Sequence, residues 1–155
     1  MIGYFLGGAE KVGSLGFILE TEKHKLLFEY GITPTKPPEY PMPAPKIDFV
    51  FLTHSHLDHS GMLPWLTTKY TPKIFGTQIT LELTDLLLRD SLKVMNMEGY
   101  PPPFDINDIE NLEPLYNSVN YHKKIYLDDM EIIPYSAGHI PGSTMYKIKT
   151  DDKSI

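Results

Sequence analysis

The chain is 155 residues long, and its 41% hydrophobic and 22% charged residues are typical of one globular domain with its own core. No apolar run approaches the roughly 20 residues of a membrane span, and the N-terminus carries no signal-peptide pattern, so we expect a cytoplasmic protein without membrane contact. The formal net charge of −6 argues against broad attraction to nucleic acid, although it does not exclude a local basic groove.

The first third of the chain predicts a strand-rich beginning. Strands are expected at 2–9, 13–21 and 24–31, and the last of them stops at Gly31. The segment from Thr33 to Pro45 holds six prolines, which favours an ordered surface loop over a helix or a central strand. Residues 46–53, "KIDFVFLT", form an almost continuous apolar run, which is typical of a strand buried on both faces.

The rest of the chain alternates helices and strands, which predicts the α/β class. A short helix is expected at 62–70, with Trp65 in the core, and a strand at 72–77. The longest helical pattern covers 77–96, with Thr77 as its N-cap. Its apolar positions are Ile79, Leu83, Leu86, Leu87 and Val94.

A second helical stretch is expected at 105–119, capped by Asp105 or Asn107. Residues 122–138 indicate a hairpin that turns at Asp128 and Asp129, and another hairpin starts at 143. His24 and His122 sit beside lysines at strand edges, so we expect both to be solvated.

The stretch "FVFLTHSHLDHSG" concentrates metal-ligand chemistry in a few residues. In extended backbone His54 and His56 point to the same face, and Asp58 and His59 lie just beyond, where the chain turns into the next helix. The chain has no cysteine, so any metal must be held by imidazole and carboxylate. Two imidazoles suit zinc, and the adjacent pair could serve a second ion. The alternative is a hydrogen-bonded polar loop that caps the helix, which four potential ligands in six residues disfavour.

These residues carry a resemblance to a known family. "THSHLDHSG" after a buried strand resembles the His-x-His-x-Asp-His motif of the metallo-β-lactamase superfamily. "YFLGGAEKVGSLGFILET", "KLLFEYG", the Pro-rich loop and "SAGHIPGS" are similar to the β-CASP branch, which includes mRNA 3′-end processing endonucleases and ribonuclease J. The resemblance implies an αββα sandwich with a mixed sheet and flanking helices. Residues 1–155 would form its N-terminal half, without the C-terminal half or the β-CASP domain.

The resemblance also implies a site. His54, His56 and His139 would bind one zinc, and Asp58 and His59 would bind a second, with Asp58 also orienting the attacking water. Glu29 stands where the family usually has aspartate and would orient the site, the alternative being a solvated strand-end acid. The family's bridging aspartate would lie beyond Ile155, so we expect one well-held zinc in this chain.

The implied function is zinc-dependent hydrolysis of RNA in processing or decay. The alternatives are another hydrolase of the same fold, acting on a thioester, lactone or small phosphodiester, and a non-catalytic scaffold that binds RNA or a processing partner. We expect the 155-residue chain by itself to cut RNA poorly and to cover exposed apolar surface by self-association.

Overall fold

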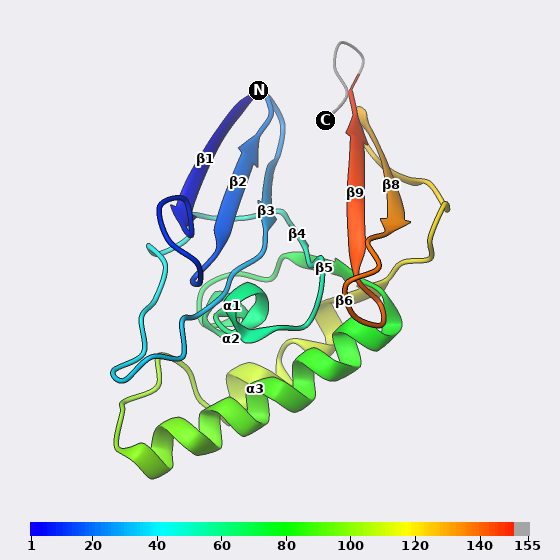
Figure 1. Ribbon diagram of the computed structural model, residues 1–155. Helices are drawn as coiled ribbons and strands as arrows, with labels where there is room; N and C mark the ends of the chain where they lie inside the picture. Colours follow the sequence, from blue (N-terminus) through cyan, green and yellow to red (C-terminus); the bar gives the residue numbers. More distant parts are fainter. Residues whose placement is uncertain (151–155) are drawn as a thin grey trace.

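A computed structural model describes residues 1–150 as three layers, in which helices cover one face of a six-stranded sheet and a three-stranded sheet covers the other (Figure 1). The predicted α/β class with a mixed sheet and flanking helices is therefore confirmed. None of the helices in residues 1–150 is both long enough and apolar enough to cross a membrane.

The larger sheet is mixed, and its strands lie in the order of the sequence. They are β1 (Ile2–Gly7), β2 (Gly16–Glu20), β3 (Lys25–Phe28), β4 (Phe49–Phe51), β5 (Lys73–Gly76) and β6 (Tyr116–Ser118). The first three pair antiparallel, and β3 to β6 run parallel. The carboxyl ends of β3, β4 and β5 therefore meet at one edge, which is where open α/β sheets place their chemistry.

The smaller sheet is antiparallel and consists of β7 (Ile125–Leu127), β8 (Met130–Ser136) and β9 (Thr144–Lys149). The hairpin between β7 and β8 turns at Asp128 and Asp129, as predicted. The strand β9 pairs back onto β8, with Ser136 opposite Thr144. The rest of the hairpin predicted to start at 143 falls on 151–155, outside the described residues.

Five helical segments connect the strands, namely α1 (Leu57–Ser60), α2 (Leu63–Thr67), α3 (Gln78–Glu98), α4 (Ile106–Glu110) and the 3₁₀ turn η1 (Glu113–Leu115). Thr77 caps α3 as predicted, because its hydroxyl oxygen accepts a hydrogen bond from the Thr80 N–H. Asp105 caps α4 and forms a capping box with Asp108.

Two apolar cores hold the three layers together. The first lies between the helices and the larger sheet and includes Val50, Leu63 and Leu88, all fully buried. The second lies between the two sheets and includes Phe51 and Ile132. Adjacent residues of β4 thus point into different cores, which explains the continuous apolar run that predicted this strand.

The apolar positions that indicated α3 do not form its buried face. Ile79, Leu86 and Val94 are 42%, 62% and 43% exposed. The buried residues are Thr80, Leu81, Thr84, Leu88, Ser91, Leu92 and Met95. This face packs inward because Leu81 and Thr80 lie against Gly76 at the end of β5, and because the Thr80 hydroxyl donates a hydrogen bond to the main-chain carbonyl of Gly142.

The prediction of one helix over 105–119 is wrong in its second half. The α4 helix stops at Glu110, and Tyr116–Ser118 form β6, with Asn117 opposite Phe75 of β5. The hydrogen bonds of β6 come from a strand some forty residues away, so no local pattern revealed them.

Of three predictions about single side chains, two are confirmed and one is wrong. Trp65 is partly buried against the first core, as expected. His24 is not solvated as predicted, because its side chain is only 16% exposed and its Nε2 lies 2.5 Å from Asp128 Oδ2. His122 is exposed, as expected.

Candidate metal centre

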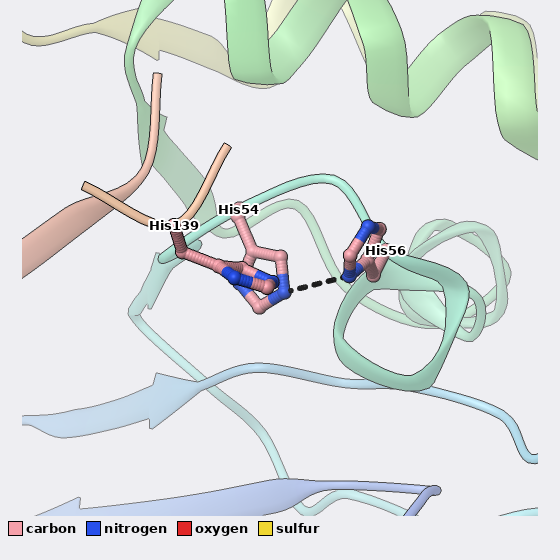
Figure 2. Close-up of side chains that lie close together, drawn as sticks. All are labelled: His54, His56 and His139. Atoms are coloured by element: carbon pink, nitrogen blue, oxygen red, sulfur yellow. Dashed lines mark hydrogen bonds between the residues drawn. The ribbon is translucent and has the colours of Figure 1, made fainter. Parts of the chain in front are cut away.

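Three imidazoles converge at the carboxyl end of β4. His54 and His56 come from the segment that follows the strand, and His139 comes from the loop between β8 and β9, as Figure 2 shows. The ring centroids lie 4.7 Å apart for His54 and His56, 4.9 Å for His54 and His139, and 5.2 Å for His56 and His139. His54 is buried and the other two are exposed, so the group opens to solvent on one side.

The donor set fits a divalent metal such as zinc. One ligand nitrogen from each of the three rings lies within 4.8 Å of the others. His54 Nε2 and His56 Nδ1 are 3.2 Å apart. Two nitrogens bound tetrahedrally at about 2.0–2.1 Å from zinc lie about 3.4 Å from each other, so this pair needs little movement to become ligands.

The loop that carries His139 is anchored from two sides. The Thr144 N–H donates to the Thr53 carbonyl oxygen (2.8 Å), which joins the start of β9 to the segment after β4. The Thr80 hydroxyl donates to the Gly142 carbonyl oxygen (3.1 Å), and Thr77 Oγ1 lies 2.9 Å from the same oxygen. Gly142 has φ +87°, and a Cβ there would overlap the side chain of Ile79, so only glycine fits this approach.

Glu29 is buried directly beneath the histidines. It is 3% exposed, so the alternative of a solvated strand-end acid is wrong. One carboxylate oxygen accepts from the Thr53 N–H (2.7 Å), and the other lies 3.1 Å from His59 Nδ1. Its φ of +63° is unusual for a residue other than glycine and turns the chain sharply at the end of β3. Burial raises the pKa of Glu29, against the opposing influence of His59 and Thr53.

A second group of possible ligands overlaps the first. Glu29, His54 and His59 each offer a ligand atom within 4.8 Å of the others. The sequence predicted that Asp58 and His59 would act together, and Asp58 Oδ2 does lie 3.5 Å from His59 Nε2. Asp58, although near, is not a member of this compact group, so the second metal position stays a prediction.

The short helix that carries Asp58 and His59 is packed onto the chain after β3. The Tyr30 N–H donates to the His59 carbonyl oxygen (2.7 Å). A Cβ at Gly31 would overlap the carbonyl group of Asp58, so this position also requires glycine.

The pKa of His54 favours metal binding. Burial, together with the neighbouring histidines, lowers the pKa of His54 to about 4, so its ring is neutral and able to act as a ligand at pH 7. Burial also lowers the pKa of His59, but the hydrogen bond to Glu29 and the charges of Glu29 and Asp58 outweigh burial and leave that pKa raised.

The structure thus brings the predicted histidines and Glu29 together and places Asp58 beside His59, and it adds positioning residues that the sequence did not reveal. Thr53 Oγ1 lies 2.8 Å from His54 Nδ1 and can fix the orientation of this ring. The Tyr146 hydroxyl donates to the Leu52 carbonyl oxygen (2.9 Å) and ties β9 to the segment after β4. Only the position of Thr53 next to a candidate ligand could have indicated its role.

Comparison with protein families gives one extended match. Residues 18–155 match the family described as the metallo-beta-lactamase superfamily domain.

Among curated proteins, the probable RNase MJ4 of Methanocaldococcus jannaschii is 35% identical over 90% of this chain. The transcription termination factor FttA of Thermococcus kodakarensis is 30% identical over 90% of the chain. The cleavage and polyadenylation specificity factor 73 of Drosophila melanogaster is 28% identical over 93% of it. The chain spans 33%, 24% and 22% of the lengths of these relatives.

Two solved structures have a fold similar to that of this chain. A metallo-beta-lactamase motif mutant from Cronobacter sakazakii superposes with a TM-score of 0.61 at 17% identity, over 98% of this chain and 58% of that one. A protein of unknown function from Enterococcus faecalis gives a TM-score of 0.67 at 18% identity, over 98% of this chain and 41% of that one.

We expect Glu29→Ala to lower the free energy of unfolding by roughly 3 kcal/mol, because it leaves the Thr53 N–H buried without an acceptor and removes the partner of His59. Urea unfolding of the metal-free protein measures this. The matched control is Glu22→Ala, an exposed acid in the turn before β3, which should change stability by less than about 0.5 kcal/mol. Equal effects of the two substitutions would contradict the anchoring role of Glu29.

Proposed function

The chain belongs to the metallo-β-lactamase superfamily, and we propose that it carries the metal-binding residues of a ribonuclease that cuts RNA by hydrolysis. The observation that carries this proposal is the convergence of His54, His56 and His139 at the carboxyl end of β4. Curated relatives named as RNases and as cleavage and polyadenylation factors support RNA as the substrate. The β-lactamases among the solved structures share only the fold at this level of identity, so they do not favour a lactam substrate.

Each residue of the centre has a separate task in this proposal. His54, His56 and His139 hold zinc, with Thr53 orienting the ring of His54. A bound divalent ion lowers the pKa of water and stabilises charge on phosphate. Asp58, whose carboxylate lies 3.5 Å from His59 Nε2, would orient the attacking water and accept its proton, while Glu29 holds His59 in place.

The number of metal ions follows from the two ligand groups. Three imidazoles form a complete protein ligand set for zinc, whereas the second group shares His54 with the first. We therefore propose one tightly held zinc in this chain and a weaker second ion near His59.

The position of Glu29 weakens the case for a non-catalytic scaffold. The replacement of the usual aspartate by Glu29 suggested a degenerate site, but the longer carboxylate is buried and contacts both Thr53 and His59. A hydrolase of thioesters or lactones has no specific observation in its favour.

We expect chelator-treated protein reloaded with zinc to retain one ion per chain tightly, as counted by elemental analysis after buffer exchange. The double substitution His54→Ala, His56→Ala should weaken this binding by about 100-fold or more, because changes to outer-sphere partners alone cost 10–100-fold. The control is the double substitution His24→Ala, His122→Ala, which removes two imidazoles outside the centre. Two tightly held ions, or equal losses in both variants, would contradict the assignment.

Cleavage of single-stranded RNA tests the activity. The relatives are about three to five times longer than this chain, so we propose that residues outside it help to position RNA. We expect the complete protein with zinc to cut RNA and the 155-residue chain to be slower by several orders of magnitude, since positioning contributes roughly 7–11 kcal/mol in favourable cases. In the complete protein, His54→Ala should reduce cleavage to background. A zinc-loaded complete protein that leaves RNA intact would refute the proposed function.

We also propose that the chain self-associates through the edge of β1. Within residues 1–150 this strand pairs with no strand but β2, and only its Leu6 carbonyl oxygen accepts from elsewhere, from the Met42 N–H. The start of its other edge therefore offers backbone groups for pairing, and Ile2 (65%) and Phe5 (46%) are exposed on this strand. Another copy of the strand satisfies both features. Sedimentation at rising concentration should show dimers, and Phe5→Lys should shift them to monomers while Leu86→Lys, on the outer face of α3, should not. A monomer at all concentrations would disprove this proposal.

A further inference from the structure

Three lysines that form no ion pair within residues 1–150 lie together at one pocket. Most basic side chains in residues 1–150 form ion pairs with carboxylates, such as Lys36 with Glu98 and Lys124 with Glu131. Lys46, Lys69 and Lys73 form none with the residues that the structure describes, and all three line the same surface pocket. Their ammonium groups are therefore available to an anionic ligand.

The pocket lies at the end of the sheet opposite the metal centre. Lys46 precedes β4, Lys69 follows α2, and Lys73 begins β5, where it lies opposite Phe49. These are the amino ends of strands whose carboxyl ends lead to the histidines. Six residues separate Asp48 in the pocket from His54, which corresponds to roughly 20 Å of extended chain. The pocket has a volume of about 470 Å³, within the usual range of about 300–1,000 Å³ for ligand sites.

The charge of the pocket is positive although the whole chain is acidic. Asp48 is its one carboxylate, and this group is engaged, because it accepts a hydrogen bond from the Lys25 N–H (2.9 Å) and lies 3.8 Å from His24 Nδ1. His24 is in turn held by Asp128. Three exposed ammonium groups thus face one occupied carboxylate in a chain of net charge −6.

Aromatic side chains accompany the lysines. Tyr70 lines the pocket and is only partly buried. The Lys69 ammonium lies 4.4 Å from the ring centre of Trp65. Lysines that neutralise phosphates, interleaved with aromatic rings that can stack on bases, are the features of sites for single-stranded nucleic acid.

We propose that this pocket binds the phosphate backbone of single-stranded RNA, as a second contact roughly 20 Å from the metal centre. The choice of RNA as the polyanion rests on the proposed function. Binding of RNA at this pocket needs no metal, so the pocket proposal and the proposed ribonuclease function can fail independently. An RNA strand that reaches both sites is held at the amino end of β4 and cut at the carboxyl end. This arrangement explains how a chain with an acidic net charge can bind a polyanion.

The test measures binding of a fluorescently labelled 20-nucleotide single-stranded RNA by anisotropy, in chelator so that no cleavage occurs. The triple substitution Lys46→Gln, Lys69→Gln, Lys73→Gln should weaken binding about tenfold near 0.1 M salt. It should also reduce the slope of log affinity against log salt by about 2, since each lost phosphate contact to a single strand removes about 0.7.

The control is Lys93→Gln, Lys123→Gln, Lys147→Gln, which changes the net charge equally and removes three lysines that also form no ion pair within residues 1–150. It should change affinity by less than about twofold, because screened surface charges away from the contact matter little. Equal losses in the two triple variants, or none in the pocket variant, would overturn the proposal. The single substitution Lys46→Gln, at an exposed position, should still weaken binding by about twofold to threefold if the triple variant proves unstable.

Inorganic phosphate and a nucleoside monophosphate, added at the same phosphate concentration as unlabelled RNA, separate a strand site from a free-phosphate site. We expect RNA to compete at least about tenfold better, since several contacts act together. Equal competition would overturn the assignment to RNA. Pocket-dependent binding in a complete protein that does not cut RNA with zinc would leave this proposal standing and remove the proposed function.

Discussion

The buried carboxylate of Glu29 is the interaction on which the metal centre depends. It accepts from the main chain at Thr53, where β4 has just ended, and from the ring of His59 on α1. Two segments that share no strand pairing are thereby fixed at the end of β3. A buried carboxylate is costly unless it is hydrogen-bonded on both oxygens, so the site is stable only with both partners in place. The left-handed backbone at Glu29 aims the side chain inward, and the longer side chain of glutamate still reaches both partners.

The second sheet completes the centre because it delivers His139, and small hydroxyl groups make this delivery accurate. Thr77 and Thr80 of the α3 N-terminus hold the carbonyl of Gly142, while Thr144 bonds the main chain at Thr53. Each of these residues is buried, and the hydroxyl group of each lies within hydrogen-bond distance of the Gly142 carbonyl oxygen. The inner face of α3 therefore combines apolar side chains such as Leu81 and Leu88 with the small side chain of Thr80 at the point where the Gly142 loop approaches.

Local sequence patterns were sufficient to predict those features of the site that depend on residues close together in the chain. The alternate spacing of His54 and His56 after an apolar strand predicted their convergence, and Thr77 was recognised as a cap from sequence alone. The burial of Glu29 and the strand at Tyr116–Ser118 could not be predicted in this way, since both depend on contacts with segments more than twenty residues away. The family match extends the local signal, because it explains why a histidine some eighty residues after the motif belongs to the same centre.

Net charge is a poor guide to what this chain can bind. The acidic side chains are spread over the surface and most cations are paired with them, so their fields largely cancel beyond about 10 Å at moderate salt. In the parallel part of the sheet two groups of side chains are separated along the strands. Imidazoles that can bind a metal gather at the carboxyl ends, and three lysines without ion pairs in residues 1–150 gather at the amino ends. The geometry of parallel strands keeps the two chemistries apart, so a polyanion can be attracted to one end without placing competing cations beside the metal ligands at the other.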